Sequence, residues 1–433
     1  MTLPPGPAAP PALQTLNWLF RPIEFMNSCQ RRHGDAFSVT FLGFETPMVM
    51  VSDPAAIRAL YRGRENGLPP GRGATLEPVL GPRSILLLEG EEHLARRRLM
   101  LPPFHGERMR AYEGIITELT AREIDTWPVG RAFAIHPRMQ ALTLQVILRA
   151  VFGVSDPARV ARLRSLLGDL LAQTSSPVIQ MRVLLFRRLG GPDPLAALNR
   201  RLAEVDTLLS AEVAERRADP DLESREDILS MLVAARFQDG TPMSDAELRD
   251  QLLTLLLAGH ETTATALAWT MDLLLRHPAT LERLRSEVDN GQEPYLRAVI
   301  SESLRLRPVV PLAGRRLREE LRVDGFTLPP GTDVTPAIWL THTRQDLYPA
   351  PLEFRPERFL DAAPETYSWI PFGGGVRRCL GASFAEFEMR VVLRETLRRW
   401  ELRGARRRPE GIARRNVTFS PRRGTPVVVR PRS

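Results

Sequence analysis

Residues 372–381 read Phe-Gly-Gly-Gly-Val-Arg-Arg-Cys-Leu-Gly, which is the most informative stretch of the chain. Three consecutive glycines predict a tight loop, because glycine adopts backbone conformations that other residues avoid. The pattern from about residue 382 to 400 is helical, so Cys379 is expected at or just before a helix N-terminus. Free amides and the positive end of the helix dipole stabilise a thiolate at such a place. The alternative is a buried, inert cysteine, which is our interpretation of Cys29.

A second informative stretch lies in the middle of a long predicted helix. Ser244 and Glu247 form a capping box, and no proline occurs from residue 245 to residue 276. A helix of that length spans about 48 Å. Its middle, residues 258–264, reads Ala-Gly-His-Glu-Thr-Thr-Ala. We expect positions 259, 262, 263 and 266 to form one face of small or hydroxylic residues, against which a large flat group or another helix packs.

The same stretch argues against a zinc hydrolase. His260 and Glu261 begin the pattern H-E-x-x-H, in which two histidines share one helical face. Position 264 is alanine, so the second zinc ligand is missing.

Composition places the chain among globular proteins. Of its 433 residues, 43% are hydrophobic and 25% are charged, which excludes disorder as the whole explanation. The richest apolar run, residues 252–258, is too short to cross a bilayer, and the N-terminus lacks the pattern of a secretory signal. We therefore expect a cytoplasmic protein without a membrane anchor. Two cysteines exclude a disulfide framework.

The charge balance is basic but distributed. The net charge is +8, all 59 basic residues are arginine, and they alternate with 51 acidic residues along the whole chain. A nucleic-acid partner would favour a basic tail or zinc-finger spacing, and neither is present. A basic patch that docks an acidic protein fits this composition better.

The order of the predicted elements gives a mainly α fold with a minor β part. A proline-rich arm, residues 1–11, is expected to be loose, and β-like stretches follow at 36–42 and 47–51. Residues 91–305 are mainly helical, with a break at 174–196. Strands and turns are expected over 308–360, then the helix after Cys379 and a β-like tail at 427–429. No linker divides the chain, so residues 1–433 are predicted to form one domain.

The stretch around Cys379 resembles the haem-ligand motif of the cytochrome P450 haem-thiolate monooxygenases. Three further stretches resemble motifs of that family in the family's order: the oxygen-activation segment at 258–263, E-x-x-R at 302–305 and P-E-R-F at 356–359. With H-x-x-x-R at 93–97, the resemblance covers essentially the whole chain. It implies the cytochrome P450 fold, in which a long central helix lies over a buried haem b. The chain lacks the long apolar N-terminal anchor of the microsomal members, and in this it resembles the soluble bacterial members.

The resemblance also implies roles for individual residues. Cys379 is the expected ligand of the haem iron, and Thr262 and Glu261 are the expected proton donors for dioxygen activation. Glu302, Arg305 and Arg358 are expected to form a structural ion network. The remaining residues expected to contact the haem are the propionate partners His93, Arg97, Arg377 and Arg315 (with Arg316 as the alternative to Arg315), together with Gly259, Thr263, Phe372, Gly373 and Gly381.

The implied reaction is hydroxylation of a lipophilic small molecule by a monomeric enzyme. Electrons are expected from a separate ferredoxin and ferredoxin reductase, which would dock on a patch formed by Arg96, Arg98, Arg378 and Arg390. Selectivity is expected to depend on residues 66–88, 170–200 and 309–313. The alternatives are haem-thiolate chemistry of another kind (desaturation, coupling or peroxide use), a non-catalytic haem sensor or carrier, and a basic nucleic-acid binder.

Overall fold

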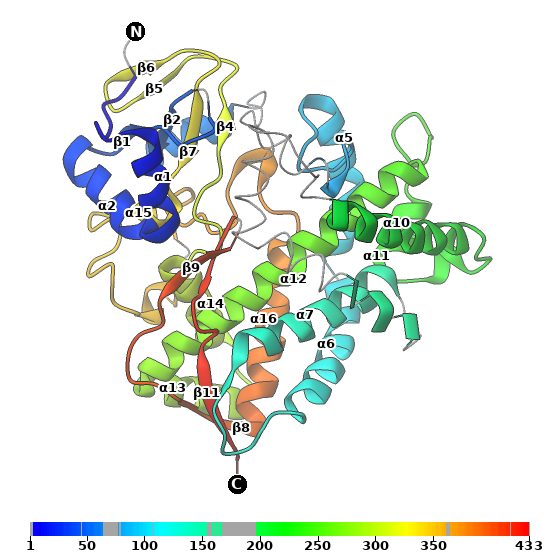
Figure 1. Ribbon diagram of the computed structural model, residues 1–433. Coiled ribbons are helices and arrows are strands. Elements are labelled where there is room, and N and C mark those ends of the chain that lie inside the picture. The colour runs from blue at the N-terminus through cyan, green and yellow to red at the C-terminus, as the bar shows by residue number, and fades with distance from the viewer. Residues whose placement is uncertain are drawn as a thin grey trace.

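The computed structural model describes residues 3–44, 46–63, 77, 79–106, 108–153, 158–159, 161–163, 165–166, 196–360, 364–415 and 417–432. Its helices are α1 (Pro11–Phe20), α2 (Pro22–His33), α3 (Pro54–Arg62), α5 (Gly90–Met100), α6 (Arg108–Ile124), α7 (Ile135–Phe152), α10 (Ala196–Arg217), α11 (Ile228–Ala234), α12 (Asp245–Arg276), α13 (Pro278–Asp289), α14 (Pro294–Leu306), α15 (Ile338–His342) and α16 (Ala382–Arg399). The chain is therefore mainly helical, as predicted (Figure 1).

The strands form small sheets at the edges of the helical part. The largest has the order β1-β2-β7-β4, in which β2 and β7 are parallel and the other pairs are antiparallel. A second sheet has the order β3-β11-β8, and two hairpins pair β5 with β6 and β9 with β10. The strands are β1 (Ala36–Val39), β2 (Met48–Val51), β3 (Phe133–Ala134), β4 (Arg315–Arg316), β5 (Leu321–Val323), β6 (Phe326–Leu328), β7 (Asp333–Pro336), β8 (Trp400–Gly404), β9 (Ile412–Arg415), β10 (Thr418–Pro421) and β11 (Pro426–Pro431).

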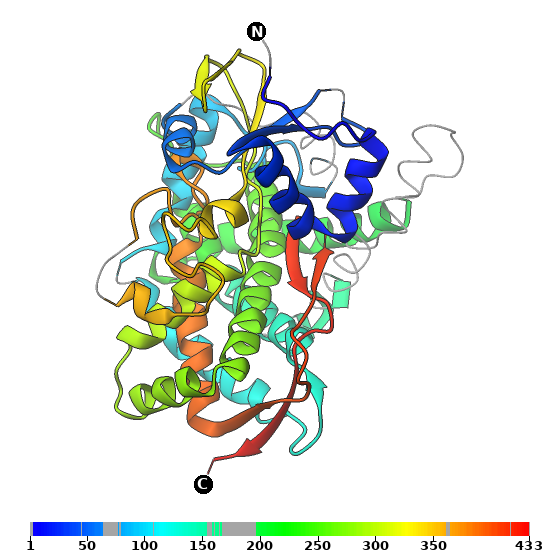
Figure 2. The same cartoon turned by 90° about the vertical axis from the view of Figure 1, so that its left-hand side faces the viewer.

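The long helix α12 has the predicted bounds and the predicted cap. The Ser244 hydroxyl accepts a hydrogen bond from the Glu247 amide, and the Glu247 carboxylate accepts one from the Ser244 amide. Helices α7, α14 and α16 contact α12, and α16 runs beside it through the molecule (Figure 2). A continuous apolar core fills the space among these helices. Among the described helices, none combines the length and the apolar character that a bilayer span requires.

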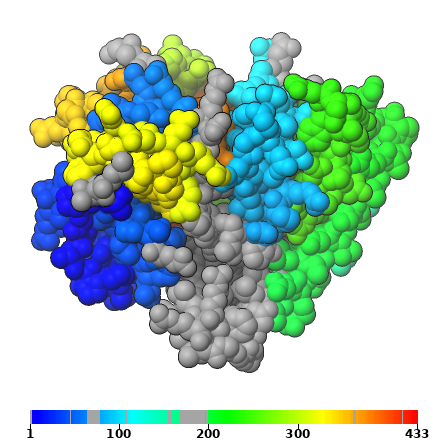
Figure 3. Space-filling view, turned by 90° about the horizontal axis from the view of Figure 1, so that it is seen from above, coloured from blue at the N-terminus to red at the C-terminus, as the bar shows by residue number. Residues whose placement is uncertain are grey.

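The molecule has two parts when it is seen from above (Figure 3). The N-terminal helices and the β5–β6 hairpin lie on one side, and α5 lies on the other side beside the green segments that include α10 and α11. Elements of both parts supply the residues expected around Cys379, since β4 belongs to the first part and α5 to the second.

The described part of the N-terminal arm, from residue 3 onward, is held by contacts with the rest of the chain, which contradicts the prediction of a loose segment. Pro4 is buried, and the Ser38 amide of β1 donates a hydrogen bond to the Pro5 carbonyl over 3.0 Å. The Gln14 side-chain amide binds the carbonyls of Pro7 and Ala9. Proline lacks an amide donor but keeps its carbonyl, so a proline-rich segment can still be fixed by donors from neighbouring elements.

Candidate functional site

Cys379 lies in a tight loop three residues before α16. Its amide donates a hydrogen bond to the Phe372 carbonyl over 2.9 Å, which closes the loop. Gly373 has a φ of +67°, a conformation that favours glycine. A Cβ atom on Gly374 would lie 2.5 Å from a ring carbon of Tyr61, which belongs to α3. The glycines are therefore required both by the turn and by the close approach of α3.

The Cys379 thiol has a higher pKa than the sequence analysis predicts. Its side chain is accessible, yet protein atoms surround it closely enough for burial to raise its pKa. The Gly381 amide, which binds the thiol, and the cations Arg378 and Arg97 act in the predicted direction and lower the pKa. Burial outweighs them, so the protein alone does not hold a thiolate. Coordination to a metal cation deprotonates a thiol outright.

Gly381 is the N-cap residue of α16, and an added Cβ atom there would meet nothing within 4 Å. The aromatic ring of Phe372 lies beneath the Arg378 guanidinium, at 6.0 Å from the ring centroid. Cys29 is buried on α2, and burial raises the pKa of its thiol to about 11, which fits an inert cysteine.

Four basic side chains converge near the cysteine loop; we call them the basic cluster. They are His93 and Arg97 of α5, Arg315 of β4, and Arg377 of the loop itself. His93 is buried, and burial lowers its pKa to about 4, with a further contribution from the three arginines. The imidazole is thus neutral at pH 7. The Arg377 guanidinium donates to the Leu88 carbonyl over 2.7 Å.

The structure distinguishes Arg315 from Arg316. Arg315 is buried, lies 5.4 Å from the centroid of the Tyr61 ring, and donates to the Gly314 carbonyl over 2.8 Å. Burial lowers the pKa of its guanidinium. Arg316 instead forms an ion pair with Asp333 at 2.9 Å. Arg315 is therefore the member of the basic cluster.

The donor set fits a haem. Among the residues that the structure describes, neither Arg97 nor Arg315 has a carboxylate within ion-pair distance. Buried cations need anionic partners, and the two propionates of haem are such partners. An accessible cysteine beside them supplies the sulfur ligand that haem iron takes in thiolate proteins. His93, Arg97, Arg315, Arg377 and Cys379 would together hold this cofactor.

The accessible side of α12 at its centre includes Ala258 and Thr262. The Thr262 hydroxyl donates to the Ala258 carbonyl over 2.7 Å, and Ala258 is exposed although it lies at the centre of the helix. Thr263 is buried and donates to the Gly259 carbonyl over 3.0 Å. A Cβ atom on Gly259 would lie 2.6 Å from Cδ1 of Ile147 on α7.

Of the predicted face at positions 259, 262, 263 and 266, Thr263 and Ala266 are buried and Gly259 packs against Ile147, so another helix covers this part of it. Ala258 and Thr262 are one turn apart, and Gly259 and Thr263 form the neighbouring pair, rotated by about 100° around the helix. Gly259 serves the contact with α7, which is the helix-packing alternative. The small residue beside Thr262 on the accessible face is Ala258, which the sequence analysis did not single out.

Glu261 points toward α7. The Gln140 side-chain amide donates to its carboxylate, and Nε2 of His136 lies 3.9 Å from it. Burial raises the pKa of Glu261, although the Gln140 hydrogen bond and Arg415 oppose the shift. Burial also lowers the pKa of His136 to about 3, so this imidazole is neutral. Gln140 and His136 belong to no motif, so nothing in the sequence indicated them.

The predicted ion network of Glu302, Arg305 and Arg358 is confirmed. Glu302 and Arg305 are fully buried and make two hydrogen bonds, at 2.6 and 2.7 Å, and Arg358 lies 3.4 Å from the same carboxylate. Arg305 also donates to the carbonyls of His342 and Pro351, each over 2.7 Å. The network therefore joins α14 to the segment that precedes the cysteine loop.

His342 completes this connection. Its Nδ1 lies 3.1 Å from the Arg305 carbonyl, and its Nε2 accepts a hydrogen bond from the Ile370 amide over 2.8 Å. The first contact needs a proton on Nδ1 and the second a lone pair on Nε2, so the ring is neutral. Burial and the Arg305 charge lower the pKa of His342 to about 3.

His342 should make the stability depend on pH. Between its ordinary pKa of 6.5 and the folded value of about 3, the unfolded chain binds a proton that the folded chain does not. The stability contribution is present above pH 6.5 and is lost as the pH falls, by about 1.4 kcal/mol per pH unit. His342→Gln should be destabilised at pH 7.5, and the difference from the parent should shrink by about 2 kcal/mol at pH 5. Urea unfolding followed by circular dichroism at both pH values measures this. An equal difference at the two values would contradict a neutral His342.

Comparisons with known proteins identify the family of the chain. A family profile described as cytochrome P450 matches residues 4–424. The chain is 45% identical to putative cytochrome P450 135B1 of Mycobacterium tuberculosis, over 99% of this chain and 92% of that protein. It is 42% identical to putative cytochrome P450 137 of the same species, over 93% and 84%. The structure of retinoic acid bound cyanobacterial CYP120A1 superposes with a TM-score of 0.87 and 27% identity, over 100% of both chains.

Proposed function

Since the chain belongs to the cytochrome P450 family, we propose that it hydroxylates a lipophilic small molecule with electrons from separate redox proteins. Members of the family bind haem b and use dioxygen, and the protein is accordingly a monooxygenase. The observation that carries the proposal is the arrangement of Cys379 and the basic cluster in one site, with Thr262 and Glu261 in the middle of α12.

The residues around Cys379 bind and orient the cofactor. When bound, the haem supplies the oxygen chemistry, to which a thiolate ligand contributes electron density that favours O–O cleavage. Cys379 is held by the closed glycine loop, and the basic cluster binds the propionates. His93, being neutral, can donate one hydrogen bond without adding a fourth positive charge to Arg97, Arg315 and Arg377.

Thr262 and Glu261 supply protons. The Thr262 hydroxyl donates to the Ala258 carbonyl one turn back, which leaves the lone pairs of its oxygen available to accept a hydrogen bond. Glu261 has a raised pKa, which brings a carboxyl group closer to the pH at which it can both take up and release a proton. Gln140 holds this carboxyl group between α7 and α12.

A lipophilic substrate is supported by two observations. Of the three segments expected to set selectivity, Val309–Ala313 is described, and Val309 is buried within the apolar core. The structure that superposes on this chain with 27% identity is retinoic acid bound, and retinoic acid is lipophilic. Most of the residues in 66–88 and 170–200 lie outside the described part of the chain.

The proposed electron donors are a ferredoxin and its reductase, which dock on arginines near the cysteine loop. The predicted patch is smaller than expected. Arg96 forms an ion pair with Glu247, and Arg390 forms one with Glu293, so their charges are largely neutralised. Arg98 and Arg378 are exposed and remain available to an acidic partner. That the enzyme is a cytoplasmic monomer, and that residues 1–433 form one domain, stay predictions.

The absorption spectrum of the reduced protein under carbon monoxide tests the haem-thiolate assignment. A strongly red-shifted Soret band is expected for the parent protein, because a thiolate ligand donates charge to the iron. Cys379→Ser should lose that band, whereas Cys29→Ser should keep it. A parent band at the position of histidine-ligated haem would contradict the assignment. Product formed with dioxygen and a reductase system separates a monooxygenase from a peroxide-using enzyme and from a haem sensor.

A further inference from the structure

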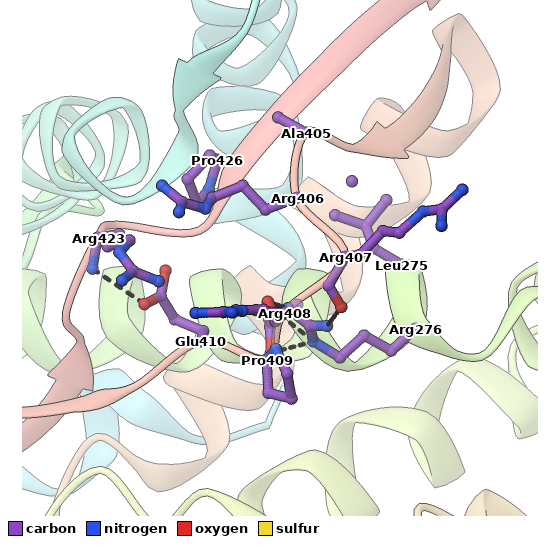
Figure 4. Close-up of a pocket in the computed structure, with 12 residues that line it drawn as sticks. Leu275, Arg276, Ala405, Arg406, Arg407, Arg408, Pro409, Glu410, Arg423 and Pro426 are labelled. Carbon is purple, nitrogen blue, oxygen red and sulfur yellow. Dashed lines mark hydrogen bonds and ion pairs between the residues drawn. The ribbon is translucent and has the colours of Figure 1, made fainter.

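A pocket rich in arginine lies at the C-terminal end of α12 (Figure 4). Its walls come from the last turn of α12, the connection between β8 and β9, and the turn before β11. Its volume is about 430 Å³, which is the size of a small-molecule site. Five arginines line it: Arg276, Arg406, Arg407, Arg408 and Arg423.

The two acidic residues of this pocket already have partners. Asp272 forms an ion pair with Arg276, one helical turn away, at 3.0 Å. The Glu410 carboxylate accepts hydrogen bonds from three backbone amides, at 2.9, 3.0 and 3.1 Å. The pocket therefore carries five arginines against two carboxylates, and among the described residues neither carboxylate forms an ion pair with Arg406, Arg408 or Arg423. Among the residues that the structure describes, Arg406, Arg408 and Arg423 have no ion pair.

The wall that carries these arginines is fixed rather than free. The Arg276 guanidinium donates to the carbonyls of Arg407 and Arg408, over 3.2 and 2.7 Å. The hydrogen bonds from the backbone amides of Gly411, Arg423 and Thr425 to the Glu410 carboxylate fix the connection before β9 and the turn at Arg423. Figure 4 shows the side chains of Arg408 and Arg423 extending over the same side of the pocket. Because the backbone of this wall is already fixed, only the arginine side chains lose entropy when they bind an anion.

We propose that this pocket binds a small polyanion that carries phosphate groups, such as pyrophosphate or a nucleoside triphosphate. Arginine presents a planar fork of N–H donors that matches phosphate oxygens, and several such forks favour a ligand with more than one phosphate. A concave pocket favours a small ligand over the flat surface of an acidic protein.

The pocket is separate from the monooxygenase site. Thr262 and Arg276 lie on the same helix, 14 residues apart, which corresponds to about 21 Å. The inference does not depend on the proposed substrate or electron donor. It also differs from the docking patch, because Arg98 lies on α5 and Arg378 in the cysteine loop.

The test is calorimetric titration of the haem-loaded protein with pyrophosphate and with ATP at 0.15 M salt, beside orthophosphate and anionic phospholipid vesicles. We expect saturable binding of pyrophosphate or ATP, and weakening by about tenfold or more in Arg408→Gln and in Arg423→Gln. The control Arg322→Gln removes an equal charge from an exposed site on β5 and should bind as the parent does.

Three results would overturn the proposal. The first is that neither pyrophosphate nor ATP binds at this salt concentration. The second is that Arg322→Gln weakens binding as much as Arg408→Gln does. The third is that only the phospholipid vesicles bind. The carbon monoxide spectrum of each variant is recorded in parallel. It should be unchanged, so that failure here is distinguishable from failure of the haem assignment.

Discussion

Arg305→Ala is expected to lower the free energy of unfolding by about 3–5 kcal/mol and to give a protein that retains little haem. The substitution leaves the fully buried Glu302 carboxylate without its two principal hydrogen bonds. It also removes the donors to the carbonyls of His342 and Pro351. His342 in turn accepts a hydrogen bond from the Ile370 amide. The substitution should therefore also loosen the segment that leads into the cysteine loop.

Urea unfolding and the ratio of Soret to protein absorbance measure the two effects. Arg355→Ala is a suitable control, since its side chain is half exposed and lies 4.0 Å from Glu353. That control should change the free energy of unfolding by less than about 0.5 kcal/mol. If Arg305→Ala kept its haem and lost no more stability than Arg355→Ala, the network would have no structural role. The loss of stability in Glu302→Gln should fall between those of Arg305→Ala and Arg355→Ala, because glutamine removes the charge of Glu302 and keeps one acceptor.

The parts of the site that were predictable are those in which local chemistry determines conformation. The capping box at Ser244 and Glu247 and the absence of proline fix α12 at its observed bounds. The glycines before Cys379 determine the turn, and the i, i+3 spacing of Glu302 and Arg305 determines their ion pair. Each of these depends on residues that are close in sequence.

The parts that were not predictable depend on long-range contacts. His342 accepts a hydrogen bond from Ile370, 28 residues away and just before the cysteine loop, and no periodicity indicates such a contact. The sequence could not decide between a flat group and another helix beside Gly259, because its neighbour Ile147 belongs to α7, and Gln140 was missed for the same reason. The thiol pKa was misjudged because burial depends on the packing of the whole chain around Cys379.

Thr262→Ala is expected to consume reducing equivalents at nearly the parental rate while forming about 100-fold less product. The Thr262 hydroxyl donates to the Ala258 carbonyl, which leaves its oxygen free to accept a hydrogen bond from water, and the substitution removes this acceptor. Haem binding should not change, since among the described residues the Thr262 hydroxyl binds only carbonyls of its own helix, those of Ala258 and Gly259. The carbon monoxide spectrum checks that point.

Thr263→Ala provides the matched control. Thr263 has the same side chain and the same hydrogen bond one turn back, to Gly259, but it is buried. If the effect of Thr262→Ala comes from proton delivery, Thr263→Ala should keep the ratio of product to oxygen consumed and lose only stability. If it came from a weaker helix, both variants would lose product in the same proportion. A variant of Thr262 that stays fully coupled would remove the proton-delivery role and leave Glu261 to act through water alone.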